Sequence, residues 1–197
     1  GLLGLLNKTN DFQIPAFFQN LNSGRAAGDP KAMQSAAQVW TLDGSVLLSR
    51  QYPDDAAAAH WLLTAPPGVV AEAASNDAYS NFGRMAAYSG QPSILGWWWH
   101  EYQWRGTLSQ MASPLTNLAC RAAFTISGLP RSRADDLSCL YESNNWDTAS
   151  EIISQYNIRY VVIGTLERRE YHIDESMFQQ HLSQVFHQGQ VVIYEVP

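Results

Sequence analysis

A short segment from Gly96 to Gly106 contains the residues best suited to bind a ligand or to do chemistry. It reads Gly-Trp-Trp-Trp-His-Glu-Tyr-Gln-Trp-Arg-Gly, so four tryptophans stand beside an imidazole, a carboxylate and a guanidinium. If the segment is helical, Trp97, Glu101 and Trp104 lie near one face, because residues three and four positions apart are neighbours on a helix. A buried charge without a partner is costly, so these charged groups should either pair with one another or line a wet cavity roofed by the indoles. The segment is therefore our first candidate for a binding site.

The same segment also fits a structural role. Tryptophan and tyrosine are common as large buried side chains with one polar group. A glutamate and an arginine four positions apart, such as Glu101 and Arg105, form an ordinary ion pair on a helix. From this segment alone, a ligand site and a purely structural, packed segment are both possible.

The overall composition narrows the class of protein. A chain of 197 residues suits one well-cored domain, since domains usually have about 100 to 200 residues. Its 12 basic and 18 acidic residues give a formal charge of -6 without any block of like charges, so neither a basic face nor a nucleic-acid partner is expected. Seven Trp, nine Tyr and seven Phe against 15% charged residues predict either a large aromatic core or an aromatic surface that contacts sugar, peptide, lipid or another domain.

Two cysteines and five histidines limit the covalent and metal chemistry. Cys120 and Cys139 are close in sequence and lack the spacing of a metal site. We expect a disulfide between them in an oxidising compartment, with two free thiols as the alternative. The histidines are scattered and none forms a ligand pair with a cysteine at useful spacing, so neither a metal nor any other cofactor is expected.

The N-terminal part of the chain predicts an irregular arm. Turn-forming residues are dense from Asn7 to Gln38 and would break any long element, so we expect residues 1–40 to form this arm. No stretch reaches the roughly 18 apolar residues of a membrane span. The apolar opening, Gly1 to Leu6, still predicts the exit of a membrane helix, or else an apolar strap that lies on the domain.

Residues 41–197 predict a single α/β domain. A turn at Asp43-Gly44 leads into a short apolar run, and the chain then alternates between helix and strand patterns with an irregular crossover in the middle. This order is typical of a small α/β sandwich with a mixed, partly parallel sheet. The expected strands are residues 69–73, 92–96, 158–164 and 191–196, and the expected helices are residues 56–63, 133–141, a helix from Asp147 onward, and 175–182.

Polar side chains follow three of these strands. Glu72 lies near the end of the first strand, the Gly96 to Gly106 segment follows the second, and Glu167 and Arg168 follow the third. In sheets of this kind the working groups gather beyond the carboxyl ends of the strands. We therefore expect these residues to meet at a single site.

Several motifs also occur in a fixed order along the chain. They are Thr41 to Gly44, Glu72, the Arg84 region, Gly96-Trp97, His100 to Gly106, Tyr156 to Gly164, Leu166-Glu167-Arg168 with Tyr171, and Val192-Ile193-Tyr194. In this combination they resemble the C-terminal soluble part of the YYY family of multi-pass membrane proteins. The resemblance covers most of the chain from about Thr41 onward. Each motif alone is weak, but the combination is specific.

The resemblance implies a location and a class of function. The YYY family is bacterial and archaeal, and its membrane part is similar to the GT-C class of lipid-dependent glycosyltransferases. A domain tethered by the last membrane helix on the extracytoplasmic face is implied, in agreement with the apolar opening and the cysteine pair. The catalytic carboxylates of GT-C enzymes lie in membrane-proximal loops, so the domain itself is not expected to be catalytic. Its implied partners are the membrane-embedded part of the same polypeptide and a glycan or glycan acceptor.

Three functions are open for the predicted site. The first is an auxiliary binding domain, in which indoles stack on sugar rings and charged groups bind hydroxyls or a phosphate. The second is a self-contained hydrolase or transferase site with His100 as general base beside Glu72 or Glu167, although the chain has none of the common nucleophile or phosphate-loop motifs. The third is a structural salt-bridge cluster, which would contain His100, Glu101, Arg105, Glu167 and Arg168.

The auxiliary binding domain is the function that we carry forward. It predicts that acidic, basic and indole side chains reach one accessible hollow at the same rim of the sheet. The residues expected to bind the ligand are Glu72, Arg84, Trp98, His100, Glu101, Trp104, Arg105, Glu167, Arg168 and Tyr171.

Overall fold

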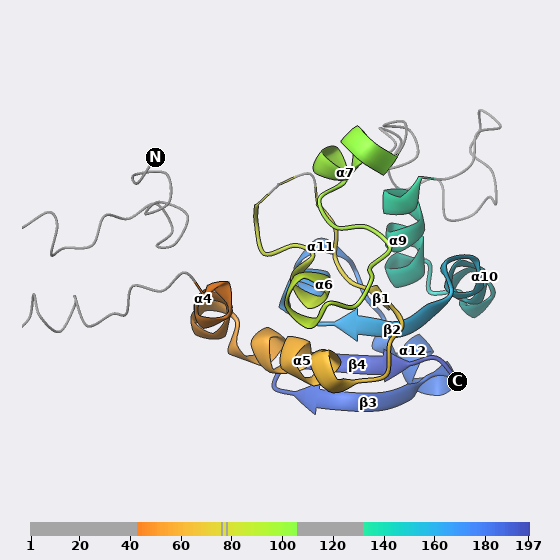
Figure 1. Cartoon of the computed structure of the whole chain (residues 1–197). Coiled ribbons are helices and arrows are strands. Elements are labelled where there is room, and N and C mark those ends of the chain that lie inside the picture. The colour runs from red at the N-terminus through yellow and green to blue at the C-terminus, as the bar shows by residue number, and fades with distance from the viewer. Residues whose placement is uncertain (1–42, 76, 78, 106–131) are drawn as a thin grey trace, which may run out of the picture. The chain divides into compact units, whose positions relative to one another are not determined.

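The structure, a computed structural model, describes residues 43–75, 77, 79–105 and 132–197 (Figure 1). The chain divides into two compact units, Gly1–Arg50 and Gln51–Pro197, and each is described by itself. In the first unit, Asp43 begins helix α4 (Gly44–Gln51), because its Oδ1 accepts the backbone N–H of Ser45 at 2.9 Å. The predicted turn at Asp43-Gly44 is thus a helix start, and the apolar run after it is helical.

The second unit is an α/β domain, which confirms the predicted fold class. Among the described residues its sheet has four strands in the order β1-β2-β4-β3. Strand β1 (Val69–Ala71) runs parallel to β2 (Ile158–Ile163), whereas β4 (Val191–Glu195) is antiparallel to both β2 and β3 (Ser183–Gln188). The helices of this unit are α5 (Pro53–Thr64), α6 (Arg84–Ser89), α7 (Trp98–Arg105), α9 (Arg133–Glu142), α10 (Trp146–Tyr156), α11 (Thr165–Glu170) and α12 (Glu175–His181).

Helices cover both faces of the sheet (Figure 1). Side chains alternate along a strand, so Tyr160 and Val162 of β2 pack with α5 and α6 on one face. Val161 and Ile163 pack with α9, α10 and α12 on the other face. All four side chains have an exposed fraction of 0%. Strand β2 is therefore a central strand buried on both faces, as its continuous apolar run predicts.

The structure differs from the prediction at two strands. Residues 92–96, expected as a strand, make one isolated parallel bridge, Ser93 with Val70, and a second bridge follows directly after them, Trp97 with Ser75. Pro92 has no N–H to donate to a strand ladder, and the chain enters α7 soon after it. Residues 183–188, for which no strand was predicted, form the edge strand β3; its mostly exposed polar side chains give no apolar run to recognise.

The helix starts follow their sequence signals closely. Pro53 opens α5 with Asp54 in its first turn, where a proline and a negative charge are both favourable. The helix predicted from Asp147 is α10, but the expectation that Asp147 caps it is wrong: the cap is Asn145, whose Oδ1 accepts the N–H of Asp147 at 2.9 Å.

Other predictions concern the membrane and the cysteines. Within the described ranges, no helix combines the length and the apolar character needed to cross a bilayer. Cys139 is buried on α9 and is bonded in a disulfide. Its predicted partner, Cys120, lies outside the described residues, as does the whole predicted arm, residues 1–40.

Candidate functional site

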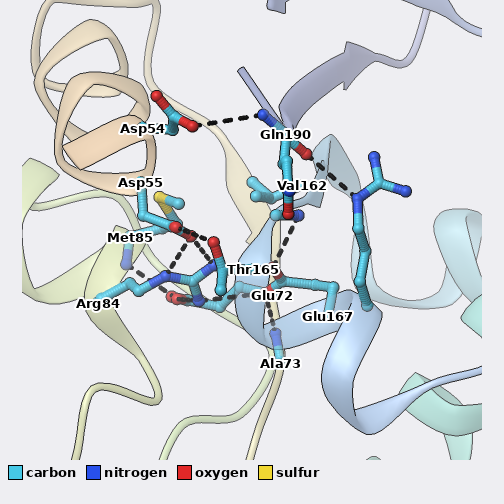
Figure 2. Close-up of polar contacts among 12 residues, drawn as sticks. Asp54, Asp55, Glu72, Ala73, Arg84, Met85, Val162, Thr165, Glu167 and Gln190 are labelled. Atoms are coloured by element: carbon cyan, nitrogen blue, oxygen red, sulfur yellow. Dashed lines mark hydrogen bonds and ion pairs between the residues drawn. The ribbon is translucent and has the colours of Figure 1, made fainter. Parts of the chain in front are cut away.

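Four charged side chains meet inside the second unit, at the carboxyl ends of the parallel strands β1 and β2. We call them the charge cluster: Asp55 from α5, Glu72 after β1, Arg84 from the start of α6, and Glu167 from α11 (Figure 2). Their exposed fractions are 0% to 1%. Glu72, Arg84 and Glu167 are residues that we predicted to meet, but they meet in the closed interior rather than in an accessible hollow.

Arg84 binds two of the carboxylates directly. Its Nη1 and Nη2 donate to Oε1 and Oε2 of Glu167 at 3.2 and 2.8 Å. Its Nε donates to Oδ1 of Asp55 at 2.7 Å, and Nη2 also donates to that oxygen. Two-pronged contacts between arginine and carboxylate combine strength with a fixed geometry. Arg84 therefore fixes the start of α6 to both α5 and α11.

The remaining contacts of these two carboxylates come from the backbone and from one hydroxyl. Glu167 accepts the N–H of Ala73 at 2.7 Å and the N–H of Gly164 at 2.9 Å. Asp55 accepts the hydroxyl of Thr165 at 2.6 Å through its second oxygen. Every oxygen of Asp55 and Glu167 thus has a donor inside the protein.

The side chain of Glu72 caps the N-terminus of helix α6. Its Oε2 accepts the N–H of Met85 at 2.8 Å and its Oε1 accepts the N–H of Ala86 at 2.9 Å. The first N–H groups of a helix have no partner within the helix, so Glu72 satisfies two of them. Nη1 of Arg84 lies 3.9 Å from Glu72 Oε2, which is too long for a hydrogen bond.

Burial and neighbouring charges shift the pKa values of the cluster. Burial raises the pKa of Glu72 to about 7, with Arg84 and the two N–H groups acting against it. Burial also acts to raise the pKa of Glu167, but Arg84 and the Ala73 N–H outweigh burial and lower the pKa. For Arg84, burial acts to lower the pKa, yet Glu167, Asp55 and Glu72 raise it overall. Arg84 and Glu167 are therefore held in their charged forms.

The charge cluster is a structural network in this conformation. Its oxygens already accept N–H and O–H groups, and its side chains do not reach solvent. It shares Glu167 with the predicted salt-bridge cluster, but the residues that accompany Glu167 are Asp55, Glu72 and Arg84. Of the partners predicted instead, the side chain of Arg105 lies outside the described part of the chain. No group of His, Cys, Asp and Glu side chains is arranged to hold a metal ion among the described residues.

Two further predicted residues are Arg168, which lies on α11, and Tyr171, which directly follows it. Tyr171 stacks on Tyr141, with ring centroids 4.8 Å apart and ring planes 14° apart. Arg168 turns away from the charge cluster: its Nε donates to the backbone oxygen of Gln190 at 3.2 Å, and its Nη1 pairs with Glu175. Arg168 therefore belongs to a separate, partly exposed contact.

The tryptophan segment forms α7, and its side chains divide into an inner and an outer set. Trp98 packs against the core, and Glu101 turns back so that its Oε1 accepts the N–H of Gly96 at 2.7 Å. Trp99 and Trp104 are on the outside, with exposed fractions of 50% and 61%. Of the predicted site residues on α7, Trp104 is therefore the one with a largely exposed side chain among those that the structure describes.

We call the α7 surface the outer side chains of α7, Trp99, His100, Gln103 and Trp104, together with Tyr79, which precedes α7 in the chain and contacts His100. The ring of His100 lies between two others, with its centroid 4.8 Å from Trp104 and 5.6 Å from Tyr79. Tyr79 is 67% exposed and has a φ of 65°, which residues other than glycine rarely adopt and which often marks a functional position.

Backbone contacts join the charge cluster to the start of α7. Ser75 donates its N–H to the oxygen of Gly96 at 3.1 Å, and Trp98 donates its N–H to the oxygen of Ser75 at 3.1 Å. Gly83, which precedes Arg84, also approaches this segment, because a Cβ on Gly83 would lie 3.6 Å from the Cα of Gly96. Of the predicted site residues, Glu72, Arg84 and Glu167 thus lie in the closed charge cluster, whereas His100 and Trp104 lie in the neighbouring α7 surface.

Asp55 is the cluster residue that the sequence analysis missed. The signal that would have found it is its spacing with Ala58, Ala59 and Leu62, which are all buried on α5. These positions follow the i, i+3, i+4, i+7 pattern of one buried helix face, so a carboxylate at the first of them points into the core.

A separate groove of about 570 Å³ lies at the opposite ends of strands β1 and β2. Gly68, Arg159 and Glu195 are among the residues that line it, and Arg159 Nε donates to Glu195 Oε1 at 2.9 Å. None of the predicted site residues lines this groove.

No protein-family model, no curated protein and no solved structure matches this chain.

Proposed function

We propose that this chain is the extracytoplasmic, noncatalytic domain of a GT-C-like membrane glycosyltransferase, and that its α7 surface binds a glycan or a glycan acceptor. The observation that carries the binding role is the exposure of two indoles on one short helix, Trp99 at 50% and Trp104 at 61%. Large exposed aromatic side chains that gather in one place are typical of interaction sites. The membrane enzyme and the extracytoplasmic location rest on the resemblance to the YYY family.

The α7 surface supplies both parts of a sugar-binding site. Indole rings present a broad apolar face that can stack on the apolar face of a sugar ring. Gln103 is exposed and its amide can both donate and accept hydrogen bonds. Gln103 follows Trp99 by four positions and Trp104 follows His100 by four, so each indole shares a helix face with a polar group.

The charges around the indoles favour a neutral ligand. Among the described side chains of α7, the exposed ones are Trp99, Gln103 and Trp104, and none of them is charged. Glu101 is turned toward Gly96. Glu72 and Arg84, which we expected to bind hydroxyls or a phosphate, are buried. A neutral sugar therefore fits this surface better than a phosphorylated or acidic sugar does.

The catalytic alternative has less support. A general base must lie within hydrogen-bond reach of the group that orients it or of the proton it removes. His100 packs against the rings of Tyr79 and Trp104, whereas Glu72 and Glu167 are held in the charge cluster. We therefore assign His100 to ligand contact rather than to proton transfer.

A titration of the chain with neutral trisaccharides tests the proposal. Cellotriose, chitotriose and mannotriose would be added while the tryptophan fluorescence is followed, because a sugar that stacks on Trp99 or Trp104 changes the surroundings of that indole. Loss of one stacking partner costs about 1 kcal/mol, so Trp99→Ala and Trp104→Ala should each weaken binding about fivefold.

The matched control is Trp146→Ala, which removes a half-buried indole on α10 that stacks on His181. This variant should bind the trisaccharides as the unchanged protein does. If none of the three sugars changes the tryptophan fluorescence, the proposal is contradicted. Binding to phosphatidylcholine vesicles without binding to any sugar would instead assign the α7 surface to the lipid interface.

A further inference from the structure

The charge cluster has three carboxyl groups and only one guanidinium. The side chains of Asp55, Glu72, Arg84 and Glu167 all have an exposed fraction of 0%. If every carboxyl group were ionised, one positive and three negative charges would leave a net charge of -2 in the interior. A buried carboxyl group without a full counter-charge takes up a proton instead.

The distances identify which carboxyl group has the least compensation. Arg84 donates directly to Asp55 at 2.7 Å and to Glu167 at 2.8 Å. Its nearest approach to Glu72 is 3.9 Å. The other donors to Glu72 are two neutral backbone N–H groups, those of Met85 and Ala86. Glu72 is therefore the carboxyl group with the weakest contact to the guanidinium of Arg84.

The other groups that face Glu72 supply no further positive charge. Tyr141 of α9 is fully buried, and burial keeps the pKa of its hydroxyl well above the ordinary value, so it stays neutral. Glu167 of α11 adds negative charge and acts to raise the pKa of Glu72, while Arg84 acts to lower it. Asp55 of α5 is the third acidic group around Arg84. Burial prevails among these effects, and the pKa of Glu72 rises to about 7.

We propose that the charge cluster takes up one proton as the pH falls through neutrality, that Glu72 carries it, and that this proton makes the conformation of the first turn of α6 sensitive to pH. Glu72 holds the N–H groups of Met85 and Ala86, so a change in its charge acts directly on the first turn of α6. Gly83 precedes that turn and lies against Gly96. Ionisation of Glu72 is therefore transmitted to the segment from which α7 begins.

Nuclear magnetic resonance of the full chain tests this directly. The ¹³C shift of the Glu72 carboxyl carbon and the amide signals of Met85, Ala86 and Gly96 would be followed from about pH 5 to 9. We expect all four signals to titrate together with a midpoint near 7. A Glu72 carboxyl that titrates near its ordinary 4.5, or one that stays ionised throughout, would overturn the proposal. If the amide signals do not titrate with the Glu72 carboxyl, ionisation of Glu72 does not act on the first turn of α6 or on Gly96, and that part of the proposal is wrong.

Two variants identify the source of the titration. Glu72→Gln should leave the three amide signals flat between about pH 5 and 9, because the titrating group is gone. Glu151→Gln, which removes an exposed carboxylate on α10, should leave the titration unchanged. If Glu72→Gln does not fold, the carboxyl signal of the unchanged protein still decides the outcome.

Discussion

Arg84 and Glu167 face each other as a two-pronged ion pair, with Nη1 3.2 Å from Oε1 and Nη2 2.8 Å from Oε2. The pair joins the first residue of α6 to a helix that follows the central strand β2. Neither side chain reaches solvent. Because a buried ion pair of this kind has lost its hydration, its stability depends on both partners being present.

Removal of the guanidinium should destabilise the domain strongly. In Arg84→Met, an apolar side chain leaves Asp55 and Glu167 buried without their counter-charge, and loss of one partner of a buried pair costs about 3–5 kcal/mol. Urea unfolding measures the change. The control is Arg159→Met, which removes a half-exposed pair with Glu195 and should cost about 1 kcal/mol or less. Equal effects of the two substitutions would contradict a structural role for the cluster.

A methyl group at Gly164 should disturb the same network. A Cβ at this position would lie 2.7 Å from Asp55 Oδ1, 2.9 Å from Arg84 Nη2 and 3.1 Å from Glu167 Oε2. Overpacking of a closed site costs about 1–3 kcal/mol, so Gly164→Ala should lower the free energy of unfolding by that amount. Gly90→Ala is the comparison: it meets no atom within 4 Å but has a φ of 75°, and backbone strain alone should cost about 1 kcal/mol.

The hydroxyl of Tyr141 should contribute to stability although it lies outside the charge cluster. It is within 2.8 Å of the oxygen of Val162 and 3.0 Å of the oxygen of Ala71, on the two parallel strands. Tyr141→Phe removes these contacts in a fully buried place, which should cost about 1–2 kcal/mol. Tyr194→Phe, whose hydroxyl lies 3.5 Å from Glu175, should cost less. Thermal unfolding of both variants measures the two losses of stability, and a larger loss in Tyr194→Phe than in Tyr141→Phe would contradict the prediction.

Stability should depend on pH in two opposite ways. The pKa of Glu167 is lowered from 4.5, so its stabilising effect is present above that value and is lost as the pH falls through the lowered pKa. The pKa of Glu72 is raised from 4.5 to about 7, so the folded protein binds the extra proton and the benefit is lost as the pH rises between these values. Relative to Glu72→Gln, the unchanged protein should therefore lose on the order of 3 kcal/mol over this window.

This difference is measured from the free energy of unfolding of both proteins at several pH values. A difference that is constant across the window would show that Glu72 has the same pKa in the folded and unfolded chains. A difference that grows with rising pH, in favour of the unchanged protein, would reverse the sign and contradict the raised pKa.

Stability should separate the two sets of tryptophans on α7. Trp104 is 61% exposed, so Trp104→Ala should change the free energy of unfolding by about 0.5 kcal/mol or less, as for an ordinary surface position. Trp98 packs against the core, and Trp98→Ala should cost about 2 kcal/mol or more. If Trp104→Ala instead lowered the free energy of unfolding as much as Trp98→Ala, its loss of sugar binding would reflect unfolding and not the loss of a contact at the α7 surface.

Much of the fold follows from local sequence patterns. Strand β2 is apolar from Tyr160 to Ile163 because both its faces are covered, and the alanine-rich helix α5 contains the predicted residues 56–63. Strand β3 is different: it lies at an edge, so most of its side chains remain in water and carry no apolar pattern. Its existence depends on pairing with β4, which is a tertiary contact that its own residues do not encode.

The candidate site was predictable in part. Glu72 and Glu167 follow strands that run parallel, so their convergence follows from topology. Their complete burial does not, because it depends on Asp55 arriving from α5 on the other side of Arg84. The sequence also does not predict where the side chain of Glu101 points, because its orientation is set by one hydrogen bond that it accepts from the N–H of Gly96.

The parallel pairing of β1 with β2 joins Val69 to Ile158, and Thr165 meets Asp55 across 110 positions of the chain. Contacts between such remote positions form slowly, because a long loop must close before any of them is made. During synthesis the first half of the domain would leave the ribosome with its acidic groups and its arginine still hydrated. Only when Glu167 has emerged can these groups withdraw from water together, so the domain should fold late and in a single step.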